Sequence, residues 1–406
     1  MNIAFVIPHF DPSLGGAETW ACRFGESLVN DGHQLHIVGE GHNPQTTDFP
    51  ITWHSVSPRH TARGARSAFH FAQQADKIIS QLHVDIVHDM GYGWKADLFQ
   101  PHGGTRLGAI RQNLMRCSRL LKPCKQLLQP LLPRYRLQKL IELRRYSNPH
   151  AWFIALSKMV QKDMHHFYPL ETERVHVIYN GVDTRRFSHR NRQQDRIALR
   201  KEWNIANDEV VLLIVAHNFA LKGLRTVIES VALLNQRRLP VHLMVVGKDR
   251  IRPYRRRADQ LGCLDRIHFL GSLGDTASCF AAADIYVHPT YYDPCSLVVL
   301  EALAMGLPVI TSRFNGAGEL ITPGQQGYLV QNPSDSAELA AAILPLLQPE
   351  VRNEMSLAAH KLAQNHSHEN NYQQILNLYH QILSARKHGP TSSLPNIPGR
   401  SVSKTG

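Results

Sequence analysis

Short apolar runs alternate along this chain with longer segments of helical periodicity, and this alternation limits the folds open to it. Several runs, such as Val-Val-Leu-Leu-Ile-Val at 210–215, are apolar on both faces, as are parallel strands covered by helices. The pattern therefore predicts an α/β protein with doubly wound parallel sheets and right-handed crossovers. We expect strands at residues 3–7, 34–38, 85–88, 152–155, 175–179, 210–216, 241–246, 266–269, 284–288, 309–311 and 328–330, and helices that include 18–30, 66–81, 224–236 and 337–347.

A charged stretch without strand-like runs divides the chain into two units, and we place the linker near residues 183–207. We expect an N-terminal Rossmann-like domain over 1–183 and a C-terminal one over 184–369, with a last helix, 370–385, that crosses back to the first. Residues 387–406 are small, polar and proline-containing, and are expected to be disordered. Two such sheets facing each other would bind a ligand in the cleft between them.

Composition narrows the class of protein. Hydrophobic residues make up 43% and charged residues 19% of the 406, as in globular proteins. No run of about 18 apolar residues predicts a transmembrane helix, and the N-terminus resembles a first strand rather than a signal peptide. The six cysteines form no Cys-x-x-Cys pair, which favours a reducing compartment and argues against a cysteine-based metal site. We therefore expect a cytoplasmic protein.

The net charge of +12 is concentrated in residues 106–145, where eleven Lys or Arg face one acid, Glu142. Leucines are interleaved with these charges, as in basic amphipathic helices that lie on anionic bilayers. One interpretation is a solvated helical face whose leucines pack on the domain core. The other is contact with an anionic membrane surface or a phosphorylated acceptor. Nucleic acid is not an expected partner, because interleaved aromatic residues are few and no nucleic-acid motif is present.

Glu301 lies inside the apolar run 297–305, which predicts a buried helix that ends at Gly306. A carboxylate in such a run is costly unless it is hydrogen-bonded. Asp293 lies eight positions earlier, and Ser296 is the expected N-cap, so free backbone N–H groups would point between the two acids. Acceptors for hydroxyl groups beside donors for an anion suit a sugar nucleotide.

Two further turns could contact a phosphate. Gly15-Gly16-Ala17-Glu18 follows the first strand, where a glycine pair lets the backbone approach a phosphate or sugar, although an ordinary tight turn fits equally well. The absence of G-x-G-x-x-G there weakens the hypothesis that the protein is an NAD-dependent oxidoreductase. Lys222 stands at the start of the helix after the first strand of the second unit, where its charge would add to the helix dipole to hold a diphosphate. A surface lysine is the alternative.

His102 lies in a glycine-flanked loop that could reach a substrate hydroxyl, although an exposed turn fits nearly as well. Gly247 ends a strand where a nucleotide could stack, and the arginines of 250–257 that follow it are more typical of a solvated helix start. The chain has no His-Glu-x-x-His, Asp-x-Asp, Gly-x-Ser-x-Gly or Walker motif. We therefore expect no metal and no cofactor beyond a nucleotide sugar as co-substrate.

Together these motifs resemble glycosyltransferase family 4, retaining enzymes with the two-Rossmann GT-B fold. The run from Asp293 to Glu301 resembles the family's E-x7-E motif. Other matching features are Gly15-Gly16-Ala17-Glu18, Ala155-Leu156-Ser157-Lys158, residues 177–183, Lys222-Gly223 and residues 282–289. The resemblance covers roughly residues 2–385, and it is strongest to the members that glucosylate the inner heptose of the lipopolysaccharide core.

The resemblance implies a role for each matching residue. Glu301 would accept hydrogen bonds from the ribose, Asp293 would hold the donor sugar, Lys222 would neutralise the leaving diphosphate, and His102 would contact the transferred sugar. The remaining donor-binding positions would be Gly15, Gly16, Glu18, His217, Gly247 and the backbone of Ser296, Leu297 and Val298. Two features depart from the family: Asp293 replaces the usual Glu, and His217 or Leu221 occupies the place of the usual diphosphate-binding Arg. Either another arginine, such as one from 250–257, substitutes for it, or diphosphate binding is weaker.

The function that follows is retaining, metal-independent transfer of a hexose from a UDP or GDP sugar, with UDP favoured, to a lipid-linked saccharide such as a lipopolysaccharide core. Such an enzyme could lie on the inner face of the cytoplasmic membrane. One alternative is a soluble sugar-nucleotide enzyme, either an epimerase or a synthase of the glycogen or sucrose type. Another is a non-catalytic sugar-nucleotide-binding protein, which the missing arginine would explain.

Overall fold

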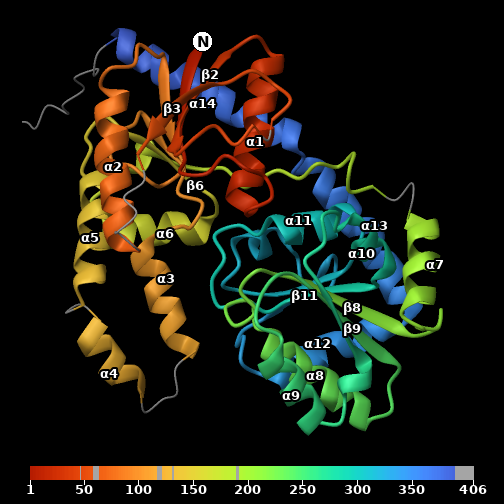
Figure 1. Cartoon of the computed structure of the whole chain (residues 1–406). Helices are drawn as coiled ribbons and strands as arrows, with labels where there is room; N and C mark the ends of the chain where they lie inside the picture. Colours follow the sequence, from red (N-terminus) through yellow and green to blue (C-terminus); the bar gives the residue numbers. More distant parts are fainter. Residues whose placement is uncertain (46, 58–63, 117–120, 130–131, 189–191, 389–406) are drawn as a thin grey trace, which may run out of the picture.

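Two α/β units form the molecule, each built on a parallel sheet (Figure 1). The computed structural model describes residues 1–45, 47–57, 64–116, 121–129, 132–188 and 192–388. The first sheet has seven strands in the order β3-β2-β1-β4-β5-β6-β7, and the second has six in the order β10-β9-β8-β11-β12-β13. All pairings between these strands are parallel, which confirms the predicted pair of doubly wound sheets.

The strands of the first sheet are β1 (Asn2–Val6), β2 (Gln34–Glu40), β3 (Thr52–Val56), β4 (Ile86–Asp89), β5 (Leu98–Phe99), β6 (Trp152–Ala155) and β7 (Val175–Val177). Those of the second are β8 (Val210–Val215), β9 (Val241–Val246), β10 (Ile267–Gly271), β11 (Ile285–His288), β12 (Val309–Ser312) and β13 (Gly327–Val330). Every predicted strand is present, whereas β3 and β5 lie outside the predicted set. β3 is a half-exposed edge strand with a polar sequence, and β5 is too short to show a period.

The helices of the first unit are α1 (Gly16–Asn30), α2 (Ala65–Ile79), α3 (Arg106–Asn113), α4 (Leu121–Leu128), α5 (Pro133–Tyr146) and α6 (Lys158–Phe167). Those that follow are α7 (Arg192–Glu202), α8 (Leu224–Gln236), α9 (Arg252–Gln260), α10 (Ala277–Ala282), α11 (Leu297–Ala304), α12 (Ser336–Ile343), α13 (Pro349–Asn365) and α14 (His368–His388). Within the part of the chain that the structure describes, none of them is both long and apolar enough to cross a membrane.

The predicted linker is not an extended connection, because α7 forms within it. Arg196 and Arg200 of α7 bind the carboxylate of Asp284 just before β11, at 2.7 and 2.5 Å. The backbone N–H of Val211 in β8 donates to the same carboxylate at 2.7 Å. The charges that suggested a linker therefore attach α7 to the second sheet.

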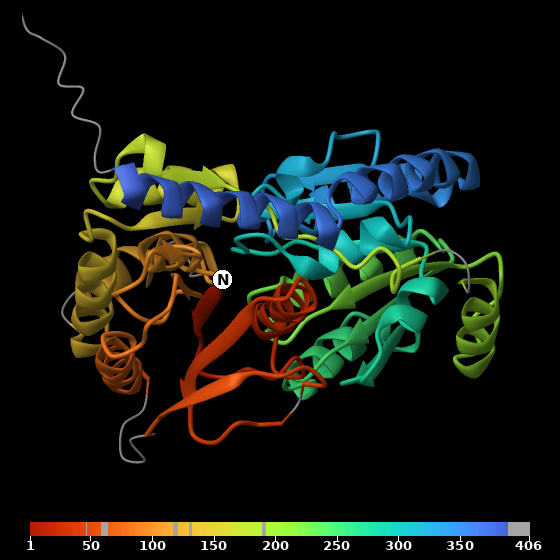
Figure 2. The ribbon, with the colours of Figure 1, turned by 90° about the horizontal axis from the view of Figure 1, so that it is seen from above.

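The last helix, α14, returns to the first unit, as Figure 2 shows. Tyr379 on α14 hydrogen-bonds the buried His88 of β4 at 2.7 Å, and the Oδ1 of Asn371 accepts a hydrogen bond from the indole of Trp20 at 3.0 Å. The helix extends to His388, so the first two residues of the tail predicted to be disordered are helical. The rest of that tail, 389–406, lies outside the described residues.

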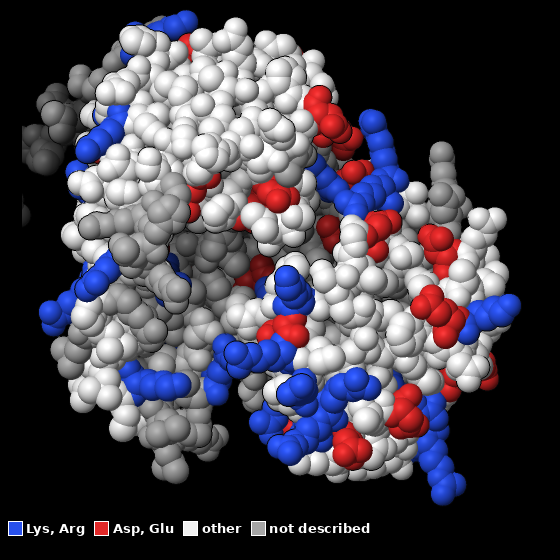
Figure 3. Space-filling view, viewed as in Figure 1, with Lys and Arg blue, Asp and Glu red and all other residues white. Residues whose placement is uncertain are grey.

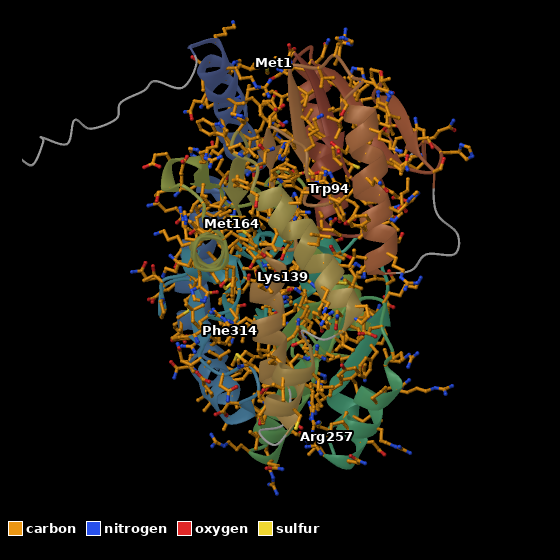
Figure 4. All side chains as sticks on the ribbon, turned by 90° about the vertical axis from the view of Figure 1, so that its left-hand side faces the viewer. Met1, Trp94, Lys139, Met164, Arg257 and Phe314 are labelled. Atoms are coloured by element: carbon orange, nitrogen blue, oxygen red, sulfur yellow. The ribbon has the colours of Figure 1, made fainter. Side chains whose placement is uncertain are left out.

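The basic segment forms α3, α4 and α5 on one side of the molecule, seen in Figure 4, where Lys139 is labelled on α5. Two of its charges are structural. Glu142 is buried and accepts hydrogen bonds from the hydroxyl of Tyr168 at 2.6 Å and from the N–H of Arg106 at 2.7 Å. Arg145 is buried and donates to the carbonyls of Gly91 and Gly93. These contacts attach the C-terminal part of α5 to the rest of the first unit.

Candidate active site

A hollow of about 780 Å³ opens between the two units. Seven of the predicted site residues line it: Gly15, Gly16, His217, Gly247, Leu297, Val298 and Glu301. They come from the start of α1, the ends of β8 and β9, and the first turns of α11. The C-terminal ends of the parallel strands of the second sheet therefore face α1 across this hollow, where open α/β sheets bind their ligands.

Glu301 faces the hollow from α11, whose remaining residues are apolar. No described residue forms a hydrogen bond or an ion pair with its carboxylate. Burial raises the pKa of Glu301 to about 7, and nearby Arg23 and Arg186 only partly oppose this effect. A buried carboxylate needs a hydrogen-bond partner, and no described protein group supplies one to Glu301. The carboxylate is therefore open to a ligand.

Asp293 is placed differently, because its carboxylate is already paired. It forms an ion pair with the ammonium group of Lys222, and both side chains are mostly buried. The Nε2 of His288 lies 3.7 Å from the same carboxylate oxygen, and the Nδ1 of His288 lies 3.1 Å from the hydroxyl of Tyr286. Burial by itself would raise the pKa of Asp293, but Lys222 and His288 together hold it below its ordinary value. Neither Asp293 nor Lys222 lines the hollow in this state.

The N-terminus of α11 begins after Ser296, which occupies the N-cap position as predicted. Its side chain, however, forms no capping hydrogen bond, which corrects the expectation of a side-chain cap. Its backbone N–H donates to Oδ1 of Asn315 at 3.3 Å. The first N–H groups of a helix have no intrahelical acceptor, and Leu297 and Val298 line the hollow where these groups begin. An anion at this end of the hollow would meet N–H donors and the positive end of the helix dipole.

Gly247 is required by the close approach of two strand ends. Its φ is 135°, and a Cβ atom there would lie 1.7 Å from the carbonyl oxygen of Ala216. The neighbouring His217 is exposed on the hollow after β8. The glycine therefore lets the ends of β8 and β9 approach each other closely. It also leaves these strand ends accessible to a planar ring such as that of a nucleotide.

Gly16 brings the first unit close to α11. It begins α1, and a Cβ atom on it would lie 3.3 Å from the side chain of Leu297. Gly15 precedes it in extended backbone and also lines the hollow. Glu18 lies in the first turn of α1, but its side chain does not line the hollow.

His102 does not line the hollow either. It is half-buried against Trp20, with ring centroids 4.8 Å apart, and its enclosed Nε2 has no hydrogen-bond partner among the described residues. Burial lowers the pKa of His102 to about 3, so the ring is neutral at pH 7. The glycine-flanked loop is packed rather than exposed: Gly104 has a φ of 67°, and a Cβ atom on it would lie 2.2 Å from the hydroxyl of Tyr292. This loop therefore abuts the segment that carries Asp293.

Arginines on the hollow were missed by the sequence reasoning. Arg23 on α1 lies 3.8 Å from Asp183, and Arg186 lies 2.8 Å from Asp275. The stretch 250–257, one source considered for a substitute arginine, does not line this hollow. The helical period of α1 could have revealed Arg23. Apart from Gly16 and Cys22, the residues of α1 that line the hollow lie on one face of the helix: Thr19, Arg23, Glu26 and Asn30.

Among the described residues, no three His, Cys, Asp or Glu side chains cluster as a metal site would require. The positively charged side chains that line the hollow are Arg23 and Arg186, whereas Lys222 lies outside its lining, paired with Asp293. Independence from metal stays a prediction.

Comparison with known proteins agrees with this architecture. Residues 14–186 match the family model Glycosyltransferase Family 4, and residues 195–365 match the model Glycosyl transferases group 1. Together the two models cover most of the chain, so it belongs to glycosyltransferase family 4.

Two curated relatives illustrate the range of the match. The chain is 30% identical to the lipopolysaccharide glucosyltransferase WaaG of Escherichia coli K12 over 178 residues, which are 44% of this chain and 48% of WaaG. It is 25% identical to an uncharacterised glycosyltransferase of Methanocaldococcus jannaschii over 361 residues, which are 83% of this chain and 87% of the relative. Several other matches, including the D-inositol 3-phosphate glycosyltransferase of Acidothermus cellulolyticus, span only about half the relative's length.

Solved structures show the same fold. The crystal structure of WaaG superposes with a TM-score of 0.78 at 21% identity, covering 93% of this chain and 99% of WaaG. HepE of Anabaena in complex with UDP-glucose gives a TM-score of 0.71 at 20% identity, covering 94% of this chain and all of HepE. The fold is therefore GT-B, as the resemblance implied.

Proposed function

We propose that this protein is a retaining glycosyltransferase that moves a hexose from a UDP sugar to a lipid-linked saccharide such as a lipopolysaccharide core. The observation that carries the proposal is Glu301, a carboxylate without a partner among the described residues, set in an apolar helix and facing the hollow between the units. Ribose hydroxyls would donate to it, while the adjacent helix N-terminus would receive the diphosphate. The likeness to HepE, which has been solved with UDP-glucose, supports the choice of UDP.

The chemistry requires charge on the leaving diphosphate to be stabilised as the glycosidic bond breaks. The donors for that charge would be the N–H groups at the start of α11 and Lys222, which would exchange Asp293 for the diphosphate. Asp293 would accept hydrogen bonds from the donor sugar. Its carboxylate is held by Lys222, so we assign it no covalent role. Attack on the same face, with the leaving phosphate taking the acceptor's proton, would retain the anomeric configuration and need no metal.

The lipid-linked acceptor is inferred from the exposed leucines of the basic segment. Leu127 and Leu128 on α4 are 76% and 58% exposed, and Leu132, Leu140 and Leu143 are also exposed. These leucines do not pack on the domain core, whereas Leu114 and Ile141 do. Exposed leucines beside lysines and arginines are typical of helices that lie on anionic bilayers. We therefore place the protein on the cytoplasmic face of a membrane, as a peripheral protein.

The donor is tested by the thermal shift that UDP, GDP and their glucose conjugates produce, because a ligand that binds only the native state raises stability by mass action. We expect UDP and UDP-glucose to raise the Tm of the wild type, and Glu301→Ala to lose most of this shift. Equal shifts in both proteins would remove Glu301 from the site. Slow hydrolysis of UDP-glucose without acceptor would exclude a non-catalytic binding protein.

Membrane contact is tested by co-sedimentation with phosphatidylglycerol vesicles. Leu127→Ser/Leu128→Ser should bind them more weakly than the wild type. Leu357→Ser, which changes an equally exposed leucine on α13, should bind as the wild type does. If both variants sediment as the wild type does, a soluble acceptor of the glycogen or sucrose type becomes the better interpretation.

A further inference from the structure

A second hollow, of about 680 Å³, lies between the basic segment and the second unit. Four arginines reach it from three elements: Arg116 at the end of the short 3-10 helix Leu114–Arg116, Arg225 on α8, and Arg256 and Arg257 on α9. The only carboxylate among its described lining residues is Glu229. Figure 3 shows lysines and arginines gathered over α8 and α9 on this face.

The positive charge of this hollow is only partly neutralised. One oxygen of Glu229 serves two arginines, with Arg225 at 3.0 Å and Arg257 at 2.7 Å. Arg256 is exposed and forms no hydrogen bond or ion pair with a described residue, and the closest polar contact of Arg116 is the side-chain oxygen of Asn113 at 3.4 Å. The four arginines and Glu229 leave three positive charges around one recess. Charges of one sign in a recess attract a counter-ion.

Two tyrosines complete the lining. The guanidinium of Arg116 lies 5.9 Å from the ring centroid of Tyr291, and the hydroxyl of Tyr291 hydrogen-bonds Ser334 at 2.7 Å. Tyr254 lines the hollow from α9. Aromatic faces with hydroxyl groups suit an organic ligand that carries both a ring and polar groups. A volume of this size is within the range of small-molecule sites.

The second hollow is one loop away from the Lys222–Asp293 pair. Gly223, which lines it, directly follows Lys222. The N–H of Tyr291, two residues before Asp293, donates to the carbonyl of Leu221 at 2.9 Å. An occupant would therefore contact the basic segment and the second unit at once, beside the groups assigned to the donor.

We propose that this hollow binds a phosphate ester on a sugar of the acceptor. The proposal rests on the function proposed above and specifies its acceptor as a phosphorylated saccharide. Guanidinium groups pair with phosphate oxygens in bidentate fashion, and the tyrosine rings would lie against the sugar. A recess walled by two units fits a discrete group of this kind better than the flat surface of a bilayer, which we assign to the exposed leucines of α4 and α5.

The test uses glucose 6-phosphate as the probe, with glucose and inorganic phosphate as matched comparisons. UDP is present at saturation so that the donor position is filled. Calorimetry compares the wild type with Arg225→Gln/Arg256→Gln, and with Arg237→Gln/Arg238→Gln, which removes the same charge from the far end of α8. We expect the first variant to bind glucose 6-phosphate about tenfold more weakly or worse, because each lost arginine removes charge-assisted hydrogen bonds. The second variant should bind as the wild type does.

Three results would overturn the proposal. Equal weakening in both variants would mean that the arginines act only through net charge. Inorganic phosphate that binds as tightly as glucose 6-phosphate would indicate a free-phosphate site. Loss of vesicle binding in Arg225→Gln/Arg256→Gln with unchanged affinity for glucose 6-phosphate would assign the arginines to the membrane. UDP binding, measured separately in each protein, distinguishes this failure from failure of the proposed function: if UDP binds and glucose 6-phosphate does not, only the second hollow was misassigned.

Discussion

Lys222 and Asp293 form an ion pair across 71 residues of sequence, just ahead of α11. The pair joins the residue assigned to the leaving diphosphate to the residue assigned to the donor sugar. A bound diphosphate would compete with Asp293 for the ammonium group. His288, whose Nε2 lies 3.7 Å from the same carboxylate oxygen, would then be the remaining protein group beside Asp293.

The first prediction concerns this pair. Lys222→Ala should lower the rate of transfer by about 10²–10³-fold, because it removes a donor aimed at the leaving charge. It should also lower the free energy of unfolding by about 3 kcal/mol, because it leaves a buried carboxylate without its main partner. Adding Asp293→Asn should recover most of the stability but none of the rate. Chemical denaturation and initial rates measure the two effects. A double variant no more stable than Lys222→Ala would contradict the coupling.

The second prediction follows from the pKa of Glu301, which burial raises to about 7. A raised carboxyl pKa means that the folded protein binds the proton more tightly than the unfolded chain. The associated stability is therefore present at low pH and is lost as pH rises through about 7. Ribose hydroxyls need the ionised form, so the affinity for UDP-glucose should rise about tenfold between pH 6 and pH 8.

Calorimetry over this pH range makes the measurement, and Glu301→Gln is the control. UDP-glucose is the suitable ligand because its diphosphate, esterified at both ends, does not titrate there. The variant should bind weakly at every pH, with a flat profile. A pH-dependent affinity that persists in Glu301→Gln would assign the titration to another group.

The third prediction compares two glycines on the same hollow. Gly247→Ala forces a Cβ atom to 1.7 Å from the carbonyl of Ala216 at a φ of 135°, whereas a Cβ atom on Gly274 meets nothing within 4 Å. We expect Gly247→Ala to lower the Tm and to weaken UDP binding, and Gly274→Ala to leave the Tm unchanged. Thermal unfolding with and without UDP checks both. Equal Tm values for the two variants would show that the strand ends can separate without cost.

The fourth prediction concerns α7. Asp284→Ala leaves Arg196 and the buried Arg200 without their carboxylate, and should lower the free energy of unfolding by about 3–5 kcal/mol. Glu171→Ala, which removes an exposed carboxylate from its pair with Arg174, should change it by less than about 1 kcal/mol. Urea denaturation of both variants makes the comparison. Similar small losses would mean that α7 contributes little to the second unit.

The local sequence pattern was enough to predict the strands that are apolar on both faces, since a run of consecutive apolar residues indicates a buried strand. Local pattern did not predict β3, because its Thr-Trp-His-Ser sequence is typical of a half-exposed edge strand. It also did not predict α7, because the charges of this helix suggest a linker when its ion pairs with Asp284 are not known. The glycine loop at His102 was expected to reach a substrate hydroxyl or to form an exposed turn, but Tyr292 from the other unit packs against it. For α7 and for the loop at His102, the deciding contact comes from a residue distant in the chain.

For the site, the sequence by itself determined that Glu301 lies in an apolar helix and that glycines stand at the strand ends, because periodicity and φ preferences are local properties. Only the tertiary structure decided that Lys222 pairs with Asp293, that Arg186 faces the hollow, and that arginines from separate elements gather in a second one. Ion pairs and hollows depend on which surfaces meet in space, and residues far apart in the chain carry no local signal of that meeting.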